Sequence, residues 1–386
     1  MTMVNKKTYV AFPFVGTKMG GSYKSASLLS KYIDKEHFNS TVFIPSKGEN
    51  FSLFKKIENV VDYNLPKFIY KSLRYENKNY VLKMISSVIV FFIGLKNLLK
   101  HKPDIVHAND VWTMLTWGAA AKILGIKVIW HVRQIQKSKL EKILIGLSDK
   151  IITISEKVHT RFESSDIEKN IILNGVEEPN LLMKSNISKA NFIYKNYSVS
   201  DSDFIVGFVG SIKESKGTLV LIKSAIRLFK KGLEFKLVVI GAVHNREYFN
   251  SILELINQPQ YSKYKENFIF TGFIAKASEA IKFFDIMVVP SKEEPFGLII
   301  IESFFSKTVV IGSDQGGIPE IITDKQNGIL FNSEDDMDLS IKISSLIKNK
   351  DERDRLSINA YKTANEKFTI RCVVKKVEEE YLKLVK

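Results

Sequence analysis

Apolar runs of strand length alternate with helix-length segments along the whole of this 386-residue chain, and no other feature constrains the fold as much. Runs that are almost continuous in Val and Ile mark strands covered on both faces. Their alternation with helical segments is typical of an α/β fold, in which helices wrap a parallel sheet. The predicted strands are 8–14, 40–45, 104–108, 127–132, 150–155 and 170–174 in the first half, and 204–210, 235–241, 267–273, 286–291, 308–312 and 328–331 in the second.

A polar stretch rich in Asn and Ser, residues 177–203, separates the two sets of strands, and we place a domain boundary within it. A chain of this length suits two domains that each bury a core of their own. We therefore predict two doubly wound domains in tandem, with a ligand cleft at the facing carboxyl ends of their strands.

Composition excludes several classes of protein. Apolar residues make up 45% of the chain and charged residues 26%, which fits neither a disordered nor a membrane-embedded protein. The single cysteine, Cys372, excludes a disulfide framework and fits a reducing cytoplasm, and the six histidines show no metal-ligand spacing. The apolar block 84–95 is shorter than the roughly 20 residues of a membrane span, so we expect a buried helix there. The apolar run after Lys6 and Lys7 lacks a signal-peptide cleavage site and is predicted to be the first core strand.

The positive charge is concentrated in the first domain. Residues 1–150 contain 24 Lys and Arg against 10 Asp and Glu, a net charge of +14, whereas residues 151–386 carry only +1. Basic residues are interleaved with aromatic residues in 66–83, a mixture that suits an anionic membrane surface. Nucleic acid or a solvated basic face would also fit. We favour the membrane surface because the bias is confined to one domain, and the predicted contacts are Lys67, Lys71, Arg74 and Lys78.

Two carboxylates, Glu294 and Glu302, flank an almost unbroken apolar run. We predict that Glu294 lies in a loop just before a helix that extends to about Phe305, and that Glu302 lies on that helix. The first amides of a helix have no intrahelical partner, and together with the helix dipole they favour an anion such as phosphate. The amides in question are those of Gly297, Leu298 and Ile299.

Glu302 follows Leu298 by four residues, so the two side chains share a helix face. A carboxylate can accept hydrogen bonds from vicinal hydroxyls, as acidic residues do with ribose or hexose. Two carboxylates beside an amide-lined anion site therefore suggest a nucleotide-sugar. The alternative, a capping glutamate followed by a surface glutamate, explains Glu294 well but explains Glu302 poorly, because Glu302 lies between Ile301 and Phe304 in an apolar helix.

The segment 290–322 resembles the Glu-x7-Glu signature of the retaining glycosyltransferases of family 4, which have the GT-B fold. The glutamate spacing, the Pro-Phe-Gly at 295–297 and the Gly-Gly-Ile-Pro-Glu at 316–320 all match. The resemblance implies that Glu294 holds the donor sugar, that Glu302 holds the ribose, and that the amides after Phe296 meet the diphosphate. It also implies two Rossmann-like domains facing an inter-domain cleft, with a last helix that returns to the first domain. The expected domains are 1–182 with 369–386, and 183–368.

The segment 208–225 is similar to the first strand and loop of the family's donor domain, where an arginine and a lysine bind the diphosphate. Lys216 stands at the lysine position, and the alternative for it is a solvent-facing side chain. Ser211 occupies the usual arginine position, which is a departure from the family pattern. Lys213 could restore the missing cation, although lysine cannot reproduce the bidentate fork of arginine.

In the first domain, Gly20 and Gly21 resemble the family's glycine loop, where backbone approaches the donor phosphate and the acceptor closely. Such a pair is also common in an ordinary tight turn. The resemblance places His131 near the reacting sugar, with His107 as the alternative. The segment 271–274 is similar to the loop that meets the nucleobase, with Gly272, Phe273 and Ile274 as the contacts.

The resemblance implies a cytoplasmic enzyme, peripheral at the inner face of the cell membrane. It would transfer a sugar with retention from a nucleoside diphosphate to a hydroxyl of a glycan or lipid-linked acceptor, in bacterial surface polysaccharide biosynthesis. The diphosphate would leave from the front face and assist the acceptor hydroxyl, with Glu294, His131 and Lys216 as catalytic residues. Cations and helix-end amides would stabilise the leaving group. No metal or other cofactor is expected, because these fixed groups would replace a metal. This agrees with the absence of a metal-binding Asp-x-Asp pair, since the acidic run 334–338 is predicted to be a solvated loop.

Other classes of protein remain as alternatives. A GT-B epimerase or phosphorylase would share the fold. A nucleic-acid-binding protein would explain the charge of the first domain but not the glutamate pair. A nicotinamide oxidoreductase is disfavoured because no Gly-x-Gly-x-x-Gly follows a strand.

Overall fold

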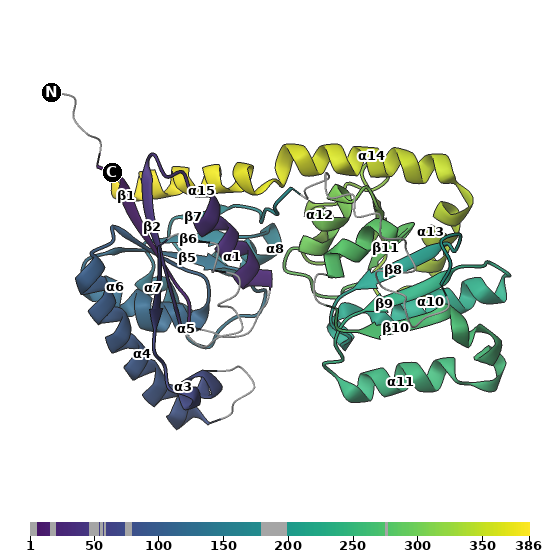
Figure 1. Ribbon diagram of the computed structural model, residues 1–386, viewed down its shortest axis with the longest axis horizontal. Coiled ribbons are helices and arrows are strands. Elements are labelled where there is room, and N and C mark those ends of the chain that lie inside the picture. Colours follow the sequence, from purple (N-terminus) through teal and green to yellow (C-terminus); the bar gives the residue numbers. More distant parts are fainter. Residues whose placement is uncertain are drawn as a thin grey trace. The chain divides into compact units, whose positions relative to one another are not determined.

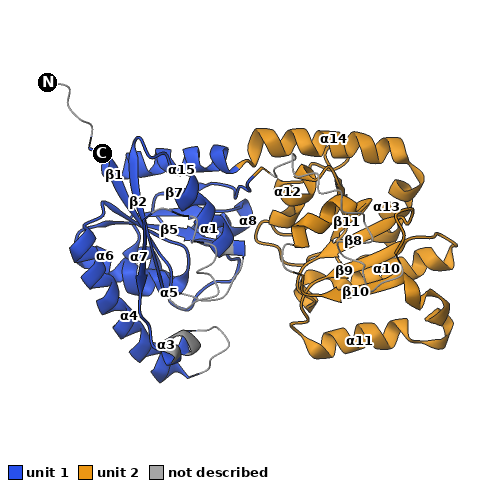
Figure 2. Cartoon of the chain, viewed as in Figure 1, with its two compact units in different colours: residues 1–177, 370–386 blue, residues 178–369 orange. Residues whose placement is uncertain are grey.

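The computed structural model describes residues 6–15, 21–45, 54, 57, 59–73, 79–178, 199–274 and 277–386, and describes Ser22, Lys67, Tyr70 and Lys71 by their backbone alone. The chain forms two compact units (Figure 2). Unit 1 comprises Met1–Glu177 and Ile370–Lys386, and unit 2 comprises Glu178–Thr369. The predicted boundary at 182/183 lies outside the described residues.

Unit 1 is built on a seven-stranded parallel sheet with the order β3-β2-β1-β4-β5-β6-β7 (Figure 1). The order reverses between β1 and β4, as it does in Rossmann-like folds. The strands are β1 (Thr8–Pro13), β2 (Phe38–Pro45), β3 (Val60–Tyr63), β4 (Ile105–Ala108), β5 (Lys127–Val132), β6 (Lys150–Thr153) and β7 (Lys169–Ile171). The main helices are α1 (Gly21–Tyr32), α3 (Lys67–Ser72), α4 (Tyr80–His101), α6 (Ala119–Ile123), α7 (Glu141–Leu147), α8 (Glu156–His159) and α15 (Ile370–Val385), with a π-helix at Met114–Gly118.

Unit 2 repeats this plan with a six-stranded parallel sheet of order β10-β9-β8-β11-β12-β13. The strands are β8 (Ile205–Val209), β9 (Lys236–Ile240), β10 (Phe268–Gly272), β11 (Ile286–Val289), β12 (Val309–Ser313) and β13 (Ile329–Phe331). The main helices are α10 (Thr218–Lys230), α11 (Arg246–Ile256), α12 (Leu298–Phe305), α13 (Asp336–Lys348) and α14 (Lys350–Lys367).

The prediction of two doubly wound α/β domains is confirmed, and each of the twelve predicted strands is present with ends that differ by at most three residues. Strand β3 was missed. It has only four residues, one of them Asp62, and among the described strands it pairs with β2 alone, at the edge of the sheet. A short edge strand that is half exposed lacks the apolar run that identified the other strands.

The two faces of the unit 1 sheet are covered by different parts of the chain. Alternate residues of β2 face opposite ways, so Val42 and Ile44 pack with α1 and α15, whereas the Phe43 ring lies 4.9 Å from that of Trp117. Helix α15 follows unit 2 in the sequence but contributes Val377 and Tyr381 to the core of unit 1. The C-terminus is therefore part of the first unit.

The expectation of a buried helix at 84–95 was wrong in one respect. These residues do belong to a helix, α4, but only four of its residues are buried: Ser86, Val90, Gly94 and Leu98. Large apolar side chains on the opposite face are exposed, among them Met84 and Phe92. A twelve-residue apolar block could be recognised as helical by its length, but the sequence did not show that only one face of the helix packs.

Candidate functional site

Glu294 lies in the loop that follows β11, and an ion pair fixes its side chain. The Lys216 ammonium is 2.6 Å from Glu294 Oε2, and both side chains are less than a quarter exposed. The Ser291 hydroxyl donates to the same oxygen at 3.3 Å. Within the part of the chain that the structure describes, Glu294 Oε1 has no hydrogen-bond partner. One carboxylate oxygen is therefore used to hold the side chain, and the other is available to a ligand.

Helix α12 begins at Leu298, directly after Gly297, whose φ of 109° turns the chain into the helix. The helix has a buried face that includes Ile300, Ile301 and Phe304. The half-buried side chains are those of Leu298, Ile299 and Glu302. The accessible side of the helix therefore carries the side chains of Leu298, Ile299 and Glu302, and it begins at the first helical amides. This arrangement can bind an anion at the helix start and a hydroxylated group about one turn further on.

The pair Gly316-Gly317 contacts the backbone of the Glu294 loop and supports it, a role that the sequence did not reveal. The Gly317 amide donates to the Glu294 carbonyl at 2.8 Å. Gly316 has a φ of 66°, and a Cβ at this position would lie 2.2 Å from the same carbonyl oxygen. Only glycine therefore allows the backbone after β12 to approach the Glu294 backbone so closely. The signal in the sequence was the Gly-Gly pair itself, which identified the family pattern but not its contact.

We expect Gly316→Ala to displace the Glu294 loop, reducing turnover at least about tenfold and costing about 2–4 kcal/mol of stability from backbone strain and overlap. Gly232→Ala is the matched control, because Gly232 has a φ of 78° but nothing lies within 4 Å of a Cβ there. The control should lose only the stability that an alanine in the left-handed conformation costs, about 1–2 kcal/mol, and its turnover should be unchanged. Steady-state kinetics and urea unfolding of both variants make the comparison. Equal turnover in the two variants would contradict the supporting role of Gly316.

The loop after β8 carries the predicted diphosphate contacts. Lys216 ends a short 3-10 helix (Glu214–Lys216) and is paired with Glu294, so it does not simply face solvent. Ser211 is half exposed and Lys213 is exposed. Lys213 forms no ion pair with any residue that the structure describes. Lys213 therefore supplies a cation two residues after Ser211, and Ser211 occupies the position at which the family pattern has arginine.

A cavity of about 420 Å³ opens beside this loop. Four carboxylates and two lysines line it, together with Gly217, Asn245, Tyr248 and the apolar pair Leu219 and Val220. Neither lysine, Lys223 or Lys292, was identified from the sequence, and Lys292 pairs with Glu334 at 2.5 Å. An excess of carboxylates disfavours a diphosphate. The helix-end amides of α12 are therefore the better phosphate site in unit 2.

The predicted nucleobase loop lies at the end of β10. Gly272 has a φ of 70°, and its carbonyl accepts from the Gly241 amide at 2.9 Å. Phe273 is 76% exposed and Ile274 is half buried. An aromatic ring this exposed is open to stacking by a planar ligand. Of the predicted glycine loop in unit 1, Gly21 is the first residue of α1, while Gly20 lies outside the described residues.

A buried polar chain in unit 1 contains both candidate histidines. The Tyr381 hydroxyl lies 2.6 Å from His107 Nδ1, and His107 Nε2 lies 3.1 Å from His131 Nδ1. The Arg133 guanidinium donates to His131 Nδ1 at 3.2 Å and also binds Asn109 and Asn174. Sequence reasoning missed Arg133 and Tyr381, and it weighed His107 against His131 as rivals, whereas the structure connects them.

These hydrogen bonds determine which nitrogen carries the proton on each histidine ring. Arginine has only donors, so His131 Nδ1 must accept, and the proton of the neutral ring lies on Nε2. His107 Nε2 then donates to His131, which leaves His107 Nδ1 to accept from the tyrosine hydroxyl. His131 Nε2 is buried and has no partner among the described residues. His131, near the carboxyl end of β5, therefore has one buried N–H donor that is left unsatisfied by the described residues.

Both rings stay neutral in the folded protein. Burial, followed by the nearby Arg133, lowers the pKa of His107 to about 3 and holds the pKa of His131 well below its ordinary value. Burial also lowers the pKa of Arg133 to about 9, so its guanidinium is charged at neutral pH. A neutral His131 is suited to orient a hydroxyl group and is not suited to act as a general acid.

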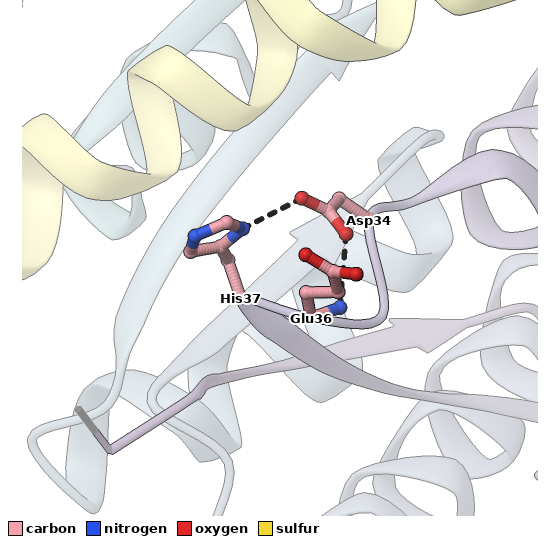
Figure 3. Close-up of side chains that lie close together, drawn as sticks. All are labelled: Asp34, Glu36 and His37. Atoms are coloured by element: carbon pink, nitrogen blue, oxygen red, sulfur yellow. Dashed lines mark hydrogen bonds and ion pairs between the residues drawn. The ribbon is translucent and has the colours of Figure 1, made fainter. Parts of the chain in front are cut away.

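One group of possible metal ligands occurs in the described part of the chain, in the turn between α1 and β2. Ligand atoms of Asp34, Glu36 and His37 lie within 4.8 Å of one another (Figure 3). His37 Nδ1 is 2.6 Å from Asp34 Oδ2, and the Glu36 amide donates to Asp34 Oδ1 at 2.9 Å. The hydrogen bond with Asp34 raises the pKa of His37 and lowers that of Asp34. The hydrogen bonds and the ion pair of Asp34 account for this exposed turn, and we assign it no metal.

Two protein-family models match the chain. Residues 19–178 match the model described as Glycosyltransferase Family 4, and residues 191–363 match the model described as Glycosyl transferases group 1. The capsular polysaccharide biosynthesis glycosyltransferase CapM of Staphylococcus aureus is 26% identical over 319 residues, which covers 76% of this chain and 82% of CapM. The uncharacterized glycosyltransferase MJ1607 of Methanocaldococcus jannaschii is 25% identical over 307 residues, covering 72% of this chain and 75% of MJ1607.

Solved structures show the same architecture. A glycosyltransferase from Rickettsia africae aligns with a TM-score of 0.80 and 19% identity, covering 98% of this chain and 99% of its own. Anabaena HepE, solved with UDP-glucose, aligns with a TM-score of 0.77 and 19% identity, covering 97% of this chain and 100% of its own. Two Rossmann-like units in this order define a GT-B fold. The chain is a family 4-like glycosyltransferase.

Proposed function

We propose that this glycosyltransferase takes its sugar from a nucleoside diphosphate and transfers it with retention of configuration. The observation that carries the proposal is the α12 site. There, Glu294 Oε1 has no hydrogen-bond partner among the described residues, and it lies in the loop that leads to the helix-start amides and to Glu302. Anabaena HepE, which shares the fold, was solved with UDP and with UDP-glucose. A nucleotide-sugar matches the site because it has a diphosphate between two groups that carry hydroxyls.

Each residue has a definite role in this proposal. Glu294 accepts from hydroxyls of the transferred sugar, and Glu302 accepts from the ribose. The amides of Gly297, Leu298 and Ile299 bind the diphosphate. Lys216 holds Glu294 in place and places positive charge beside the leaving group, with Lys213 as a second cation. His131 donates from Nε2 to a hydroxyl of the sugar or acceptor.

No nucleophilic side chain is required in this scheme. The bond between the anomeric carbon and the diphosphate oxygen breaks, and the acceptor oxygen bonds to the same face of that carbon. The acceptor proton passes to the departing diphosphate. The protein contributes fixed charge and dipoles that stabilise the negative charge growing on the leaving group.

A thermal-shift screen of nucleotide-sugars tests the donor. A donor that binds only the folded protein stabilises it by about 2.7 kcal/mol at 100 times its Kd, so the preferred nucleotide-sugar should raise the Tm the most. Analysis of the product anomer by NMR then tests retention. No stabilisation by any nucleotide-sugar or nucleoside diphosphate would contradict the donor class, and an inverted product would contradict the mechanism.

We expect transfer to survive exhaustive chelation, because cations and helix-end amides take the place of a divalent ion at the diphosphate. The measurement is the turnover of protein treated with EDTA, with magnesium or manganese added back. Complete loss of activity that either ion restores would show that the enzyme is metal-dependent.

The acceptor is proposed to be a hydroxyl of a glycan or lipid-linked saccharide, in bacterial surface polysaccharide biosynthesis, by analogy with CapM. The net charge of +14 in residues 1–150 supports a cytoplasmic location at the inner, anionic surface of the membrane. Of the basic residues predicted to meet it, Arg74 and Lys78 lie outside the described residues, and Lys67 and Lys71 are described by their backbone in α3.

A further inference from the structure

Helix α4 presents an apolar stripe on its exposed face. Val81, Met84, Val88, Phe92 and Leu99 are each more than half exposed, and their spacing of three, four and seven residues places them on one side of the helix. Ile85 lies on the same side and is 47% exposed. Figure 1 shows α4 along the outer border of its unit. We call these six residues the α4 stripe.

The orientation of α4 is fixed by its other face. Ser86, Val90, Gly94 and Leu98 are buried, and the helix lies so close to Trp117 that a Cβ on Gly94 would be 3.1 Å from its ring. The helix therefore cannot roll to bury the stripe. Its 22 residues are long and apolar enough to cross a membrane, but a helix with one face in a domain core lies along a surface instead.

The charges around the stripe indicate what covers it. From residue 77 to residue 103 the chain has five lysines and neither Asp nor Glu. Lys96 and Lys100, on the exposed side of α4, form no ion pair with the described residues. A second copy of the chain would bring its own lysines against them and repel. An anionic lipid surface supplies both an apolar layer and negative phosphates, and lysines reach such phosphates by extending along the helix.

We propose that the α4 stripe inserts into the boundary between headgroups and acyl chains of an anionic membrane, with Lys96 and Lys100 binding lipid phosphates. This names the surface and the mode of the membrane contact in the proposed function, but it depends on neither the donor nor the transfer reaction. Insertion differs from adsorption by charge alone because salt does not screen the burial of apolar side chains.

The test compares two triple variants of the full chain. Met84→Gln, Val88→Gln and Phe92→Gln remove the centre of the stripe at exposed positions, so the fold should be retained. Met337→Gln, Ile341→Gln and Ile358→Gln are the control, since these unit 2 side chains are 50%, 54% and 62% exposed. Sedimentation is measured with vesicles of phosphatidylcholine alone and with added phosphatidylglycerol, at 0.05 M and 1 M NaCl. Donor binding is measured on the same proteins.

We expect wild type and control to bind anionic vesicles and to retain part of that binding at 1 M NaCl, where the Debye length is about 3 Å. The stripe variant should bind roughly tenfold or more weakly and lose all binding at 1 M salt, while its donor affinity is unchanged. Equal vesicle binding by the two triple variants would overturn the proposal. A wild-type dimer in lipid-free sedimentation velocity that the stripe variant converts to a monomer would assign the stripe to a second copy instead. If none of the proteins, wild type included, binds a nucleotide-sugar donor, the result would contradict the proposed function and not this inference.

Discussion

Glu294→Gln is expected to lower turnover by roughly 10- to 100-fold, since a hydrogen bond to a charged group contributes about 1.5–3 kcal/mol. The substitution keeps the shape of the side chain but removes the negative charge that pairs with Lys216 at 2.6 Å. It also replaces one carboxylate oxygen, the group proposed to receive the sugar hydroxyls, with an NH₂ donor. Steady-state kinetics with the preferred nucleotide-sugar gives kcat and KM separately.

Glu302→Gln should behave differently, raising the KM for the donor with a smaller effect on kcat, because the ribose contact is the same in the ground state and the transition state. Glu293→Gln is a matched control, since this exposed neighbour has the same charge and no proposed ligand contact. Its kinetics should equal those of the wild type. The assignment of the two glutamates fails if both Glu294→Gln and Glu302→Gln retain wild-type kcat and KM.

The second large effect is a loss of stability in mild acid. Burial lowers the folded-state pKa of His107 to about 3 and depresses that of His131 as well. At a pH below their ordinary pKa of 6.5, both rings therefore take up protons when unit 1 unfolds. The unfolded state then binds more protons than the folded state, and stability rises with pH. The full contribution is present above pH 6.5 and decreases as the pH falls. Well below pH 6.5, each histidine should lower the free energy of unfolding by about 1.4 kcal/mol per pH unit.

Urea unfolding between pH 7.5 and 5.0 measures this slope, and the pair should account for a loss of about 4 kcal/mol over that interval. His107→Gln should remove roughly half of the pair's contribution to the slope, whatever its effect on absolute stability, because His131 still takes up a proton on unfolding. The exposed His244→Gln is the control and should leave the slope unchanged. His37 acts in the opposite direction, since its pKa is raised by Asp34. A stability that is constant from pH 7.5 to 5.0 in the wild type would contradict the burial of neutral His107 and His131.

The strands and the helix after Glu294 were predictable because their signals are local. A strand covered on both faces must be apolar over its own length, so twelve of the strands could be located from single runs such as 286–291. The start of α12 was equally local, because Gly297 and the apolar run that follows it belong to one segment. The spacing of Glu294 and Glu302 on one helix face follows from helix geometry alone.

What holds these residues in place was decided by the tertiary structure. Lys216 and Glu294 are separated by 78 positions in the sequence, and they meet because β8 and β11 are neighbours in the sheet. The close approach of Gly316 to the Glu294 carbonyl depends in the same way on β11 lying beside β12. The sequence contained each of these residues, but their contacts depend on the strand order.

The same reason applies to unit 1. Tyr381 and His107 are 274 positions apart, and their hydrogen bond forms because α15 returns to pack on the first sheet. The apolar composition of α4 was plain in the sequence, yet its burial depends on the single face that Gly94 brings against Trp117. Local sequence determined which segments are helices and strands, and which residues can carry charge or bind a hydroxyl. Strand order and helix packing determined which of those groups meet, since contacts across a fold join positions that no local pattern relates.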